Sequence, residues 1–129
     1  MDYTEKELME TCVESELIYD GQVVHLYVDR VKLPDGKQGI REYVKHIGAV
    51  AVLPLTDDEE VICVRQYRYA HGVVMLEIPA GKLDSADEDR LLAAKRELRE
   101  ETGFEAANWL HLCVASVLTK YSIQTLLLT

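Results

Sequence analysis

Three glutamates lie close together in the second half of the chain, within the run Arg96-Glu97-Leu98-Arg99-Glu100-Glu101. Glu97, Glu100 and Glu101 are three and four positions apart, so on a helix they project from one face within about one turn. Such a cluster is ordinary on a solvated helix, but carboxylates this close repel one another, and a divalent cation between them turns repulsion into affinity. Hard oxygen ligands favour Mg²⁺, or Mn²⁺, over zinc. We therefore predict a cation site here.

The helix that would carry these glutamates is predicted within residues 81–104. Its first turn is expected to be capped by one of three residues, Asp84, Ser85 or Asp87. Gly103 stands where helices commonly end in the left-handed conformation. The expected buried stripe recurs at helical spacing and comprises Leu91, Ala94, Leu98 and Thr102. Glu97 and Glu101 would border this stripe, at the edge of the core.

Strands are expected on both sides of this helix. The nearly apolar residues 48–55 predict a central strand that is buried on both faces. Residues 61–68 are expected to pair with it as a hairpin, with Cys63 in the core, and residues 74–78 form a further short strand. After the helix, residues 109–118 predict another strand. The apolar residues 123–129 are expected to form a sheet edge or a segment prone to aggregation.

The first third of the chain predicts a separate antiparallel unit. Residues 1–14 are polar and acidic, which is typical of a loose lead-in or a short helix. Residues 23–33 alternate well enough for a long strand, and Pro34-Asp35-Gly36 is a turn signal. Residues 39–46 would pair back as a hairpin. Because such a unit buries little by itself, it must lie against the main domain or a second copy of the chain.

Composition limits the classes of function. The 129 residues are expected to form a single domain, 1–129, and the net charge of -9 argues against general nucleic-acid binding, although a nucleotide substrate stays compatible. Residues 1–10 show no signal peptide and no apolar run approaches the ~20 residues of a membrane span, so no membrane partner is expected. The three widely spaced cysteines favour reduced thiols in a cytoplasm.

The pattern of Gly81, Glu88 and residues 96–104 resembles the Nudix box of nucleoside-diphosphate-linked hydrolases. Six residues separate Gly81 from Glu88, one more than in the usual box, and we interpret the difference as an insertion in the loop before the helix. Three further segments resemble the ADP-ribose pyrophosphatase branch of this family: residues 41–53, 65–68 and 77–81. The resemblance covers roughly residues 16–115.

The resemblance implies an α+β fold, with a Nudix-type mixed β-sheet flanked by helices. Residues 1–46 would be an N-terminal antiparallel β extension, and residues 47–129 the Nudix core, atypical after residue 115. Members of this branch are similar in forming homodimers that exchange N-terminal strands, which would supply the missing burial. The implied reaction is Mg²⁺-dependent hydrolysis of a small nucleoside diphosphate sugar, ADP-ribose, to AMP and ribose 5-phosphate.

The resemblance also implies roles for individual residues. The metal ligands would be Glu97, Glu100, Glu101 and the carbonyl of Ala80, just before the box glycine, Gly81. Glu88 would orient a ligand or a water behind them, and Arg96 would pair with Glu100 four residues on. The residues expected to contact substrate are Arg41, Arg65, Arg68 and Glu77: the arginines would bind phosphate or the nucleotide end, and Glu77 would accept from ribose or adenine or assist the metals.

The end of the chain departs from the branch, which usually places a catalytic glutamate in a late loop. The last acidic residue here is Glu105, and residues 106–129 contain no Asp, Glu, Gly or Pro. We therefore expect a shortened C-terminal part. Either the base is lost, or Glu100, Glu101 or Glu77 activates the water. The alternatives are hydrolysis of another nucleoside diphosphate sugar or dinucleotide, a weakly active or inactive nucleotide-binding domain, or a truncation product without a role.

Overall fold

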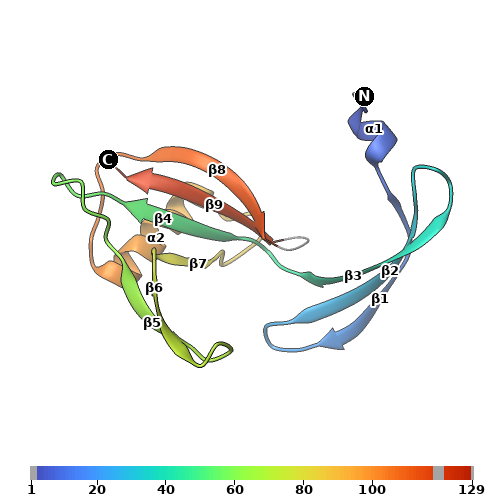
Figure 1. Ribbon diagram of the computed structural model, residues 1–129, viewed down its shortest axis with the longest axis horizontal. Helices are drawn as coiled ribbons and strands as arrows, with labels where there is room; N and C mark the ends of the chain where they lie inside the picture. Colours follow the sequence, from blue (N-terminus) through green and yellow to red (C-terminus); the bar gives the residue numbers. More distant parts are fainter. Residues whose placement is uncertain (1–2, 118–120, 129) are drawn as a thin grey trace. The chain divides into compact units, whose positions relative to one another are not determined.

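The computed structural model describes residues 3–117 and 121–128. The chain divides into two compact units at the junction between His46 and Ile47. Figure 1 labels their helices and strands. Neither α1 nor α2, the helices of the described residues, is long and apolar enough to cross a membrane.

The first unit contains a short helix, α1 (Glu5–Leu8), followed by a three-stranded antiparallel sheet. The sheet has the order β1 (Thr11–Asp20), β2 (His25–Lys32) and β3 (Gln38–Lys45). The predicted hairpin is thus confirmed, since β2 and β3 pair along their whole lengths. The lead-in was expected to extend to residue 14, but β1 already begins at Thr11, because this segment pairs with β2 from Lys32 onward.

The first unit buries little of its own surface. Every residue of β1 is exposed, and Val31 and Asp29 are the buried residues among the described part of the sheet. Asp29 is satisfied by the Ser15 hydroxyl, which donates to its Oδ1 at 2.6 Å. The rings of Tyr27 and Tyr43 stack across β2 and β3 with centroids 5.6 Å apart. Local pairing therefore holds this sheet more than a hydrophobic core does.

The second unit is built on a mixed four-stranded sheet. Its order is β7 (Ala80–Lys82), β4 (Ala49–Pro54), β9 (Tyr121–Leu128) and β8 (Leu110–Val117). β4 pairs antiparallel with β7 and parallel with β9, and Val50 and Val52 are fully buried, which confirms the predicted central strand. The tail is not the predicted sheet edge, because β9 lies between β4 and β8.

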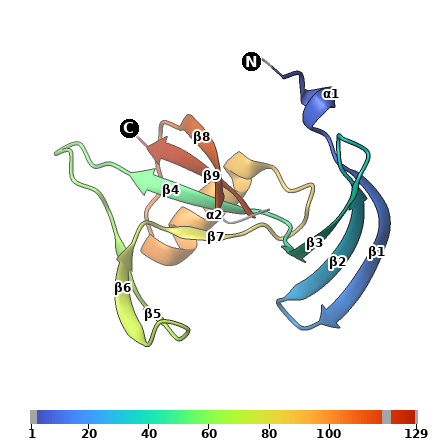
Figure 2. The same cartoon turned by 45° about the vertical axis from the view of Figure 1, so that its right-hand side comes forward.

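A separate two-stranded sheet consists of β5 (Val64–Arg68) and β6 (Val73–Glu77). We expected residues 61–68 to pair with the central strand, and this is wrong. Both edges of β4 are occupied by β7 and β9, so only an isolated bridge from Leu55 to Val61 remains. The hairpin therefore projects from the larger sheet, as Figures 1 and 2 show. Cys63 is exposed rather than in the core, because it lies in the segment leading to this hairpin.

The box helix, α2 (Arg90–Thr102), begins later than predicted. Its cap is Asp89, whose Oδ1 accepts from the Leu92 N–H at 2.9 Å. The three expected caps lie in the loop before it, where the Asp84 N–H donates to the Glu88 carboxylate at 2.6 Å. The predicted end is confirmed: Gly103 has a φ of 76°, and its N–H donates to the Arg99 carbonyl.

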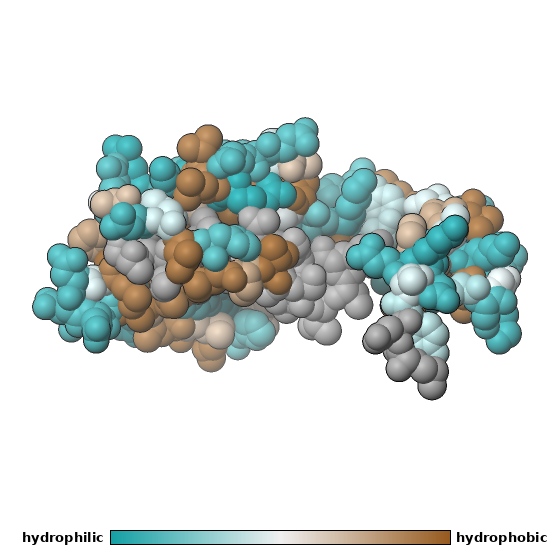
Figure 3. Space-filling view, turned by 90° about the horizontal axis from the view of Figure 1, so that it is seen from above, coloured by the Kyte–Doolittle hydropathy of each residue, from teal (hydrophilic) through white to brown (hydrophobic). Residues whose placement is uncertain are grey.

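α2 packs on β4 and β7 and closes the core of the second unit. The buried cluster comprises Val50, Val52, Leu83, Ala93, Ala94 and Leu98. Ala94 and Leu98 were predicted, but Leu91 is 38% exposed and Ala93 is buried instead, because the small Ala93 and Ala94 bring the helix close to the sheet. β8 carries three exposed large hydrophobic side chains, Leu110, Leu112 and Val114, and Figure 3 shows hydrophobic surface on the second unit.

Candidate functional site

The candidate site forms where β7 passes α2, and its first element is the contact between Gly81 and Glu97. The Glu97 side chain reaches back from α2 and is buried, with 8% of the residue exposed. Its carboxylate lies directly against the Gly81 backbone, so a methyl group at this position would overlap it. The glycine is therefore required for space, and it fixes where the Glu97 carboxylate lies.

Arg96 is the centre of an ion-pair cluster beside this contact. Its Nη1 donates to Glu97 Oε1 at 2.5 Å and lies 3.6 Å from Glu100 Oε2, so the predicted pair with Glu100 is present. Its Nη2 lies 3.3 Å from Glu88 Oε1 and donates to the Lys82 carbonyl at 3.1 Å. These contacts hold the guanidinium in one orientation, and with it the Glu97 side chain.

Sequence reasoning missed part of this cluster. Asp84, expected as a helix cap, instead lies with Oδ2 3.4 Å from Arg96 Nε, and the Lys82 carbonyl was not considered. The extra residue between Gly81 and Glu88 was a signal that the loop has its own role. No sequence signal indicates that a backbone carbonyl turns toward an arginine.

The charge of Glu97 is unfavourable in the absence of a cation. Burial raises the pKa of the Glu97 carboxyl, Arg96 opposes this shift, and the nearby Glu100 and Glu101 raise the pKa further. A buried carboxylate with two carboxylates near it gains by binding a proton or a metal cation. The electrostatics thus agree with the chemistry predicted for the glutamate cluster.

Glu101 also reaches β7, at Ala80, whereas Arg96 reaches it at Lys82. It is exposed, and its Oε2 accepts from the Ala80 N–H at 3.0 Å. Ala80 was predicted to offer its carbonyl oxygen to a metal. In the structure, the contact between Ala80 and Glu101 is made by the Ala80 N–H and does not involve the Ala80 carbonyl oxygen.

The donor set fits a hard divalent cation in type, although the three carboxylates are not gathered around one point. Within the described residues, no three Asp, Glu, His or Cys side chains are placed to hold a metal ion together. Glu97 is held against Gly81, whereas the Glu100 side chain is 61% exposed and Glu101 is also exposed. Rotation of these two long side chains toward Glu97 would complete an all-oxygen site of the kind that Mg²⁺ prefers.

Arg68 and Glu77 form an ion pair on the β5–β6 hairpin. Arg68 Nε donates to Glu77 Oε1 at 2.8 Å and Oε2 at 3.1 Å, and Nη2 also donates to Oε2. The hydrogen bonds from Arg68 lower the pKa of the Glu77 carboxyl. Glu101 is close enough to contribute to a raised Arg68 pKa, after the larger effect of Glu77. The base of the hairpin lies close to α2, since Val64, which faces Glu77 across the hairpin, lines one pocket with Glu101.

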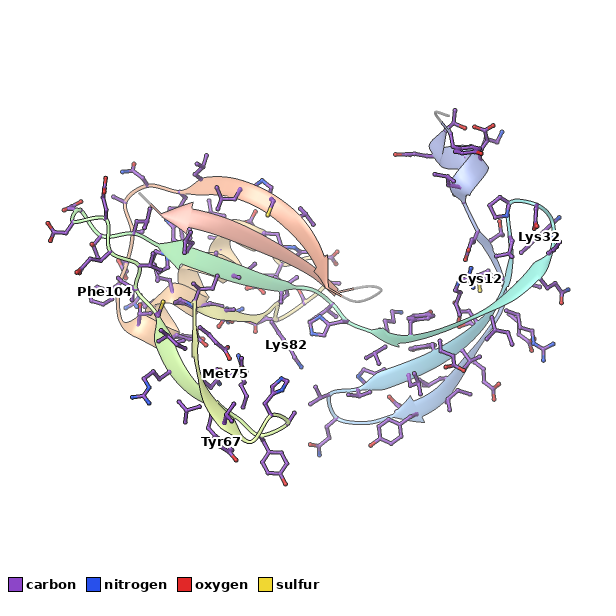
Figure 4. All side chains as sticks on the ribbon, viewed as in Figure 1. Cys12, Lys32, Tyr67, Met75, Lys82 and Phe104 are labelled. Atoms are coloured by element: carbon purple, nitrogen blue, oxygen red, sulfur yellow. The ribbon has the colours of Figure 1, made fainter. Side chains whose placement is uncertain are left out.

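Arg65 does not lie on the same face of the hairpin as Arg68. Successive side chains of a strand alternate between its two faces, so Arg65 and Tyr67 lie on the face of the hairpin opposite to Arg68. Arg65 lines an open pocket of about 390 Å³ together with Glu101 and Phe104. Figure 4 labels Tyr67 on the hairpin and Phe104 just beyond α2.

Arg41 belongs to the first unit, unlike the other predicted site residues. There its Nε donates to Glu10 Oε2 at 2.9 Å, and Nη2 donates to Oε1 of the same carboxylate. The remaining predicted residues all belong to the second unit: Arg65, Arg68, Glu77, Ala80, Gly81, Glu88, Arg96, Glu97, Glu100 and Glu101.

Comparison with protein families identifies the class. Residues 45–123 match the family model described as the NUDIX domain, which is more than half of the chain, and residues 10–44 match the nucleoside diphosphate sugar hydrolase N-terminal domain. The chain belongs to the Nudix family, and the predicted resemblance is confirmed.

Curated relatives point to one branch of this family. The chain is 48% identical over 101 residues to an ADP-ribose pyrophosphatase of Bacillus subtilis (strain 168), covering 78% of this chain and 54% of that protein. It is 42% identical over 97 residues to an ADP-ribose pyrophosphatase of Mycobacterium tuberculosis (strain ATCC 25618 / H37Rv), covering 75% and 47%. A methanol dehydrogenase activator of Bacillus methanolicus is 46% identical over 96 residues, covering 74% and 51%. The chain spans about half the length of these relatives.

A solved structure supports the fold. The crystal structure of an ADP compounds hydrolase superposes with a TM-score of 0.79, covering 94% of this chain and 68% of that one, at 24% identity. This likeness confirms the predicted fold class, a mixed α+β fold of the Nudix type.

Proposed function

We propose that the chain carries the metal-binding part of a Mg²⁺-dependent hydrolase that cleaves the pyrophosphate bond of ADP-ribose, giving AMP and ribose 5-phosphate. The observation that carries this proposal is the Glu97 carboxylate, which Gly81 and Arg96 hold in place at the start of an acidic helix face. The ADP-ribose pyrophosphatases among its relatives support the choice of substrate.

The proposed metal ligands are Glu97, Glu100, Glu101 and the carbonyl of Ala80, with Mg²⁺ as the cofactor and Mn²⁺ as a substitute. When bound, the cation neutralises pyrophosphate charge and lowers the pKa of a water molecule. Arg96 keeps Glu97 in its rotamer, and Glu88 in turn orients Arg96. Arg68 binds a phosphate oxygen, and Arg65 contacts the substrate from the pocket that it shares with Glu101.

The water is activated, in this proposal, by Glu100 or Glu101. Both Glu77 oxygens already accept from Arg68, which leaves Glu77 as the weaker of the three candidates that the sequence offered. The side chains of Glu100 and Glu101 are exposed, so each can exchange its present partner, Arg96 or the Ala80 N–H, for a bound substrate. A general base contributes typically 10²–10⁴-fold in rate, so removal of the correct glutamate has a large effect.

The proposal includes a homodimer and a cytoplasmic location. The exposed strand β1 offers a surface to a second copy of the chain, and in this proposal Arg41 reaches the nucleotide end across the dimer. The three cysteines are free and exposed, which is stable in a reducing compartment.

A substrate panel tests the reaction. The chain is incubated with Mg²⁺ and ADP-ribose, ADP-glucose, UDP-glucose or diadenosine diphosphate, and the products are separated by ion-pair chromatography. The proposal expects AMP and ribose 5-phosphate in equal amounts from ADP-ribose, and much less product from the other substrates. A Glu101→Gln variant serves as the control for contaminating activity.

A second candidate is hydrolysis of a different nucleoside diphosphate sugar, which the match of residues 10–44 to a nucleoside diphosphate sugar hydrolase domain favours. Faster cleavage of ADP-glucose or UDP-glucose than of ADP-ribose would establish it. If ADP-ribose binds but no product exceeds the Glu101→Gln control, the domain binds nucleotides without turnover and the enzyme proposal is wrong.

A further inference from the structure

The ion pair between Arg68 and Glu77 spans the length of the β5–β6 hairpin. In the register of this sheet, Val64 faces Glu77 and Arg68 faces Val73, so the two charged residues lie at opposite ends of the hairpin. Both side chains lie on the same face of the hairpin. Gln66 and Met75 face each other, Arg68 is two positions from Gln66, and Glu77 is two positions from Met75. Their backbones are four residue steps apart along the strands, and each step is a rise of about 3.3 Å.

The pair therefore sets the direction of the Arg68 side chain. Arg68 precedes the turn at the tip of the hairpin, whereas Glu77 ends β6 three residues before Ala80. By accepting hydrogen bonds from Nε and Nη2, Glu77 draws the guanidinium away from the tip and toward the base of the hairpin. The electrostatic effect of Glu101 on Arg68 agrees with this direction.

One edge of the guanidinium is left for a ligand. The bonds to Glu77 use Nε and Nη2, and within the described residues no hydrogen bond from Nη1 is formed. The Arg68 side chain is 41% exposed and that of Glu77 is 22% exposed, so the acid is the more enclosed partner. This is the arrangement expected of a carboxylate that orients an arginine for another anion.

We propose that Glu77 is a positioning residue, which acts on the substrate through Arg68 by aiming its free Nη1 edge at a phosphate oxygen beside the α2 carboxylates. This inference rests on the proposed pyrophosphate substrate. It replaces the two roles that the sequence suggested for Glu77, contact with the nucleoside and assistance to the metals. In those roles the carboxylate would share its oxygens between Arg68 and a ligand, whereas in the structure both oxygens accept from Arg68.

A double-mutant cycle tests the inference. Glu77→Gln, Arg68→Ala and the double variant are compared with wild type for KM and kcat on ADP-ribose, and for the Mg²⁺ concentration that gives half-maximal rate. Glu77→Gln is expected to raise KM by about tenfold, the usual scale for losing a group that orients a ligand-binding side chain. It should leave kcat and the Mg²⁺ requirement nearly unchanged, and it should have no further effect when Arg68 is already alanine.

Two further variants separate positioning from general effects. Glu77→Asp keeps a carboxylate on the hairpin and should recover part of the wild-type KM. Glu60→Gln removes the same charge from the exposed loop before Val61, where the Glu60 side chain forms no ion pair with the described residues, and should behave as wild type. Equal far-ultraviolet circular dichroism spectra establish that each variant folds.

Two outcomes would overturn the inference: a higher Mg²⁺ requirement for Glu77→Gln, or an undiminished Glu77→Gln effect in the Arg68→Ala background. Either would show that Glu77 contacts metal or substrate itself. Failure of the proposed function appears differently, as no AMP release by wild type. In that case calorimetric titration with inorganic pyrophosphate decides: weaker binding by Glu77→Gln than by wild type upholds the positioning role, and equal binding rejects it.

Discussion

At the scale of single residues, the contact between Gly81 and Glu97 explains the glycine that begins the box. The residue has no unusual backbone angle, since its φ is not among the positive values of Gly36, Gly48, Gly72 and Gly103. What requires glycine is the Glu97 carboxylate packed against its Cα. The requirement is therefore for space, and a side chain here would move a proposed metal ligand.

Gly81→Ala should lose activity without losing the fold. The new methyl group meets only the end of a flexible side chain, so Glu97 can rotate away at a small cost. Displacing a catalytic group by about 1 Å can cost 10²-fold, and we expect a loss of this order in AMP release. Gly39→Ala is the control, because its methyl group meets nothing closer than a Leu33 carbon at 3.3 Å. Equal activity of both variants would refute this reading of the glycine.

The Arg68–Glu77 pair predicts a pH dependence of stability. The folded-state pKa of Glu77 is lowered by Arg68, so the pair contributes its stability above the ordinary glutamate pKa and loses it as pH falls through the lowered value. The melting-temperature difference between wild type and Glu77→Gln should be constant from pH 7 to about pH 5 and shrink below about pH 4. A difference that grows on acidification would contradict the sign of this shift.

At the scale of elements, the beginning of α2 gives a stability prediction. Asp89 caps the helix through Oδ1, and replacing such a cap by alanine typically costs about 1 kcal/mol. Asp89→Ala should therefore lower the free energy of unfolding in urea by about this amount. Asp87→Ala, which removes the same charge from the preceding loop, should change it little. If Asp87→Ala were the more damaging variant, the sequence-based choice of cap would be correct after all.

The sequence predicted well those elements whose residues are close together in the chain. The glycine end of α2, the buried strand β4 and the hairpin of β2 and β3 were all confirmed. The errors concern which strand lies beside which. Residues 61–68 did not pair with the central strand, because β7 and β9 compete for its edges, and no pattern within 61–68 reports this competition.

The candidate site was predictable in part for the same reason. The pairs that follow from helical spacing, such as Arg96 with Glu100, could be predicted. The position of Glu97 at the core edge was also correct, whereas Glu101, predicted to lie there too, is exposed. The contacts of Arg96 with Asp84 and the Lys82 carbonyl depend on how the preceding loop folds back. The separation of Arg65 from Arg68 follows from their odd spacing on one strand, so it could have been predicted from the sequence once residues 61–68 were interpreted as a strand.

At the scale of the whole molecule, the exposed strand β1 bears on assembly. It carries four exposed large hydrophobic side chains, Val13, Leu17, Ile18 and Tyr19. Because β1 is also an edge strand, whose outer backbone groups can pair with another chain, we expect a homodimer in solution. Sedimentation equilibrium should give twice the 14.7 kDa mass of the chain. A single species at the chain mass over the whole accessible concentration range would rule out strand exchange between subunits.

In the proposed function, the carboxylates of α2 hold the divalent cation that makes pyrophosphate cleavage possible. The most direct measurement is the rate of AMP release from ADP-ribose as a function of Mg²⁺ concentration, for wild type and Glu97→Gln. We expect a wild-type rate that is negligible without Mg²⁺ and rises to saturation. We expect a Glu97→Gln rate that is about 10²-fold lower. A wild-type rate independent of Mg²⁺, or identical curves for both proteins, would contradict the proposed function.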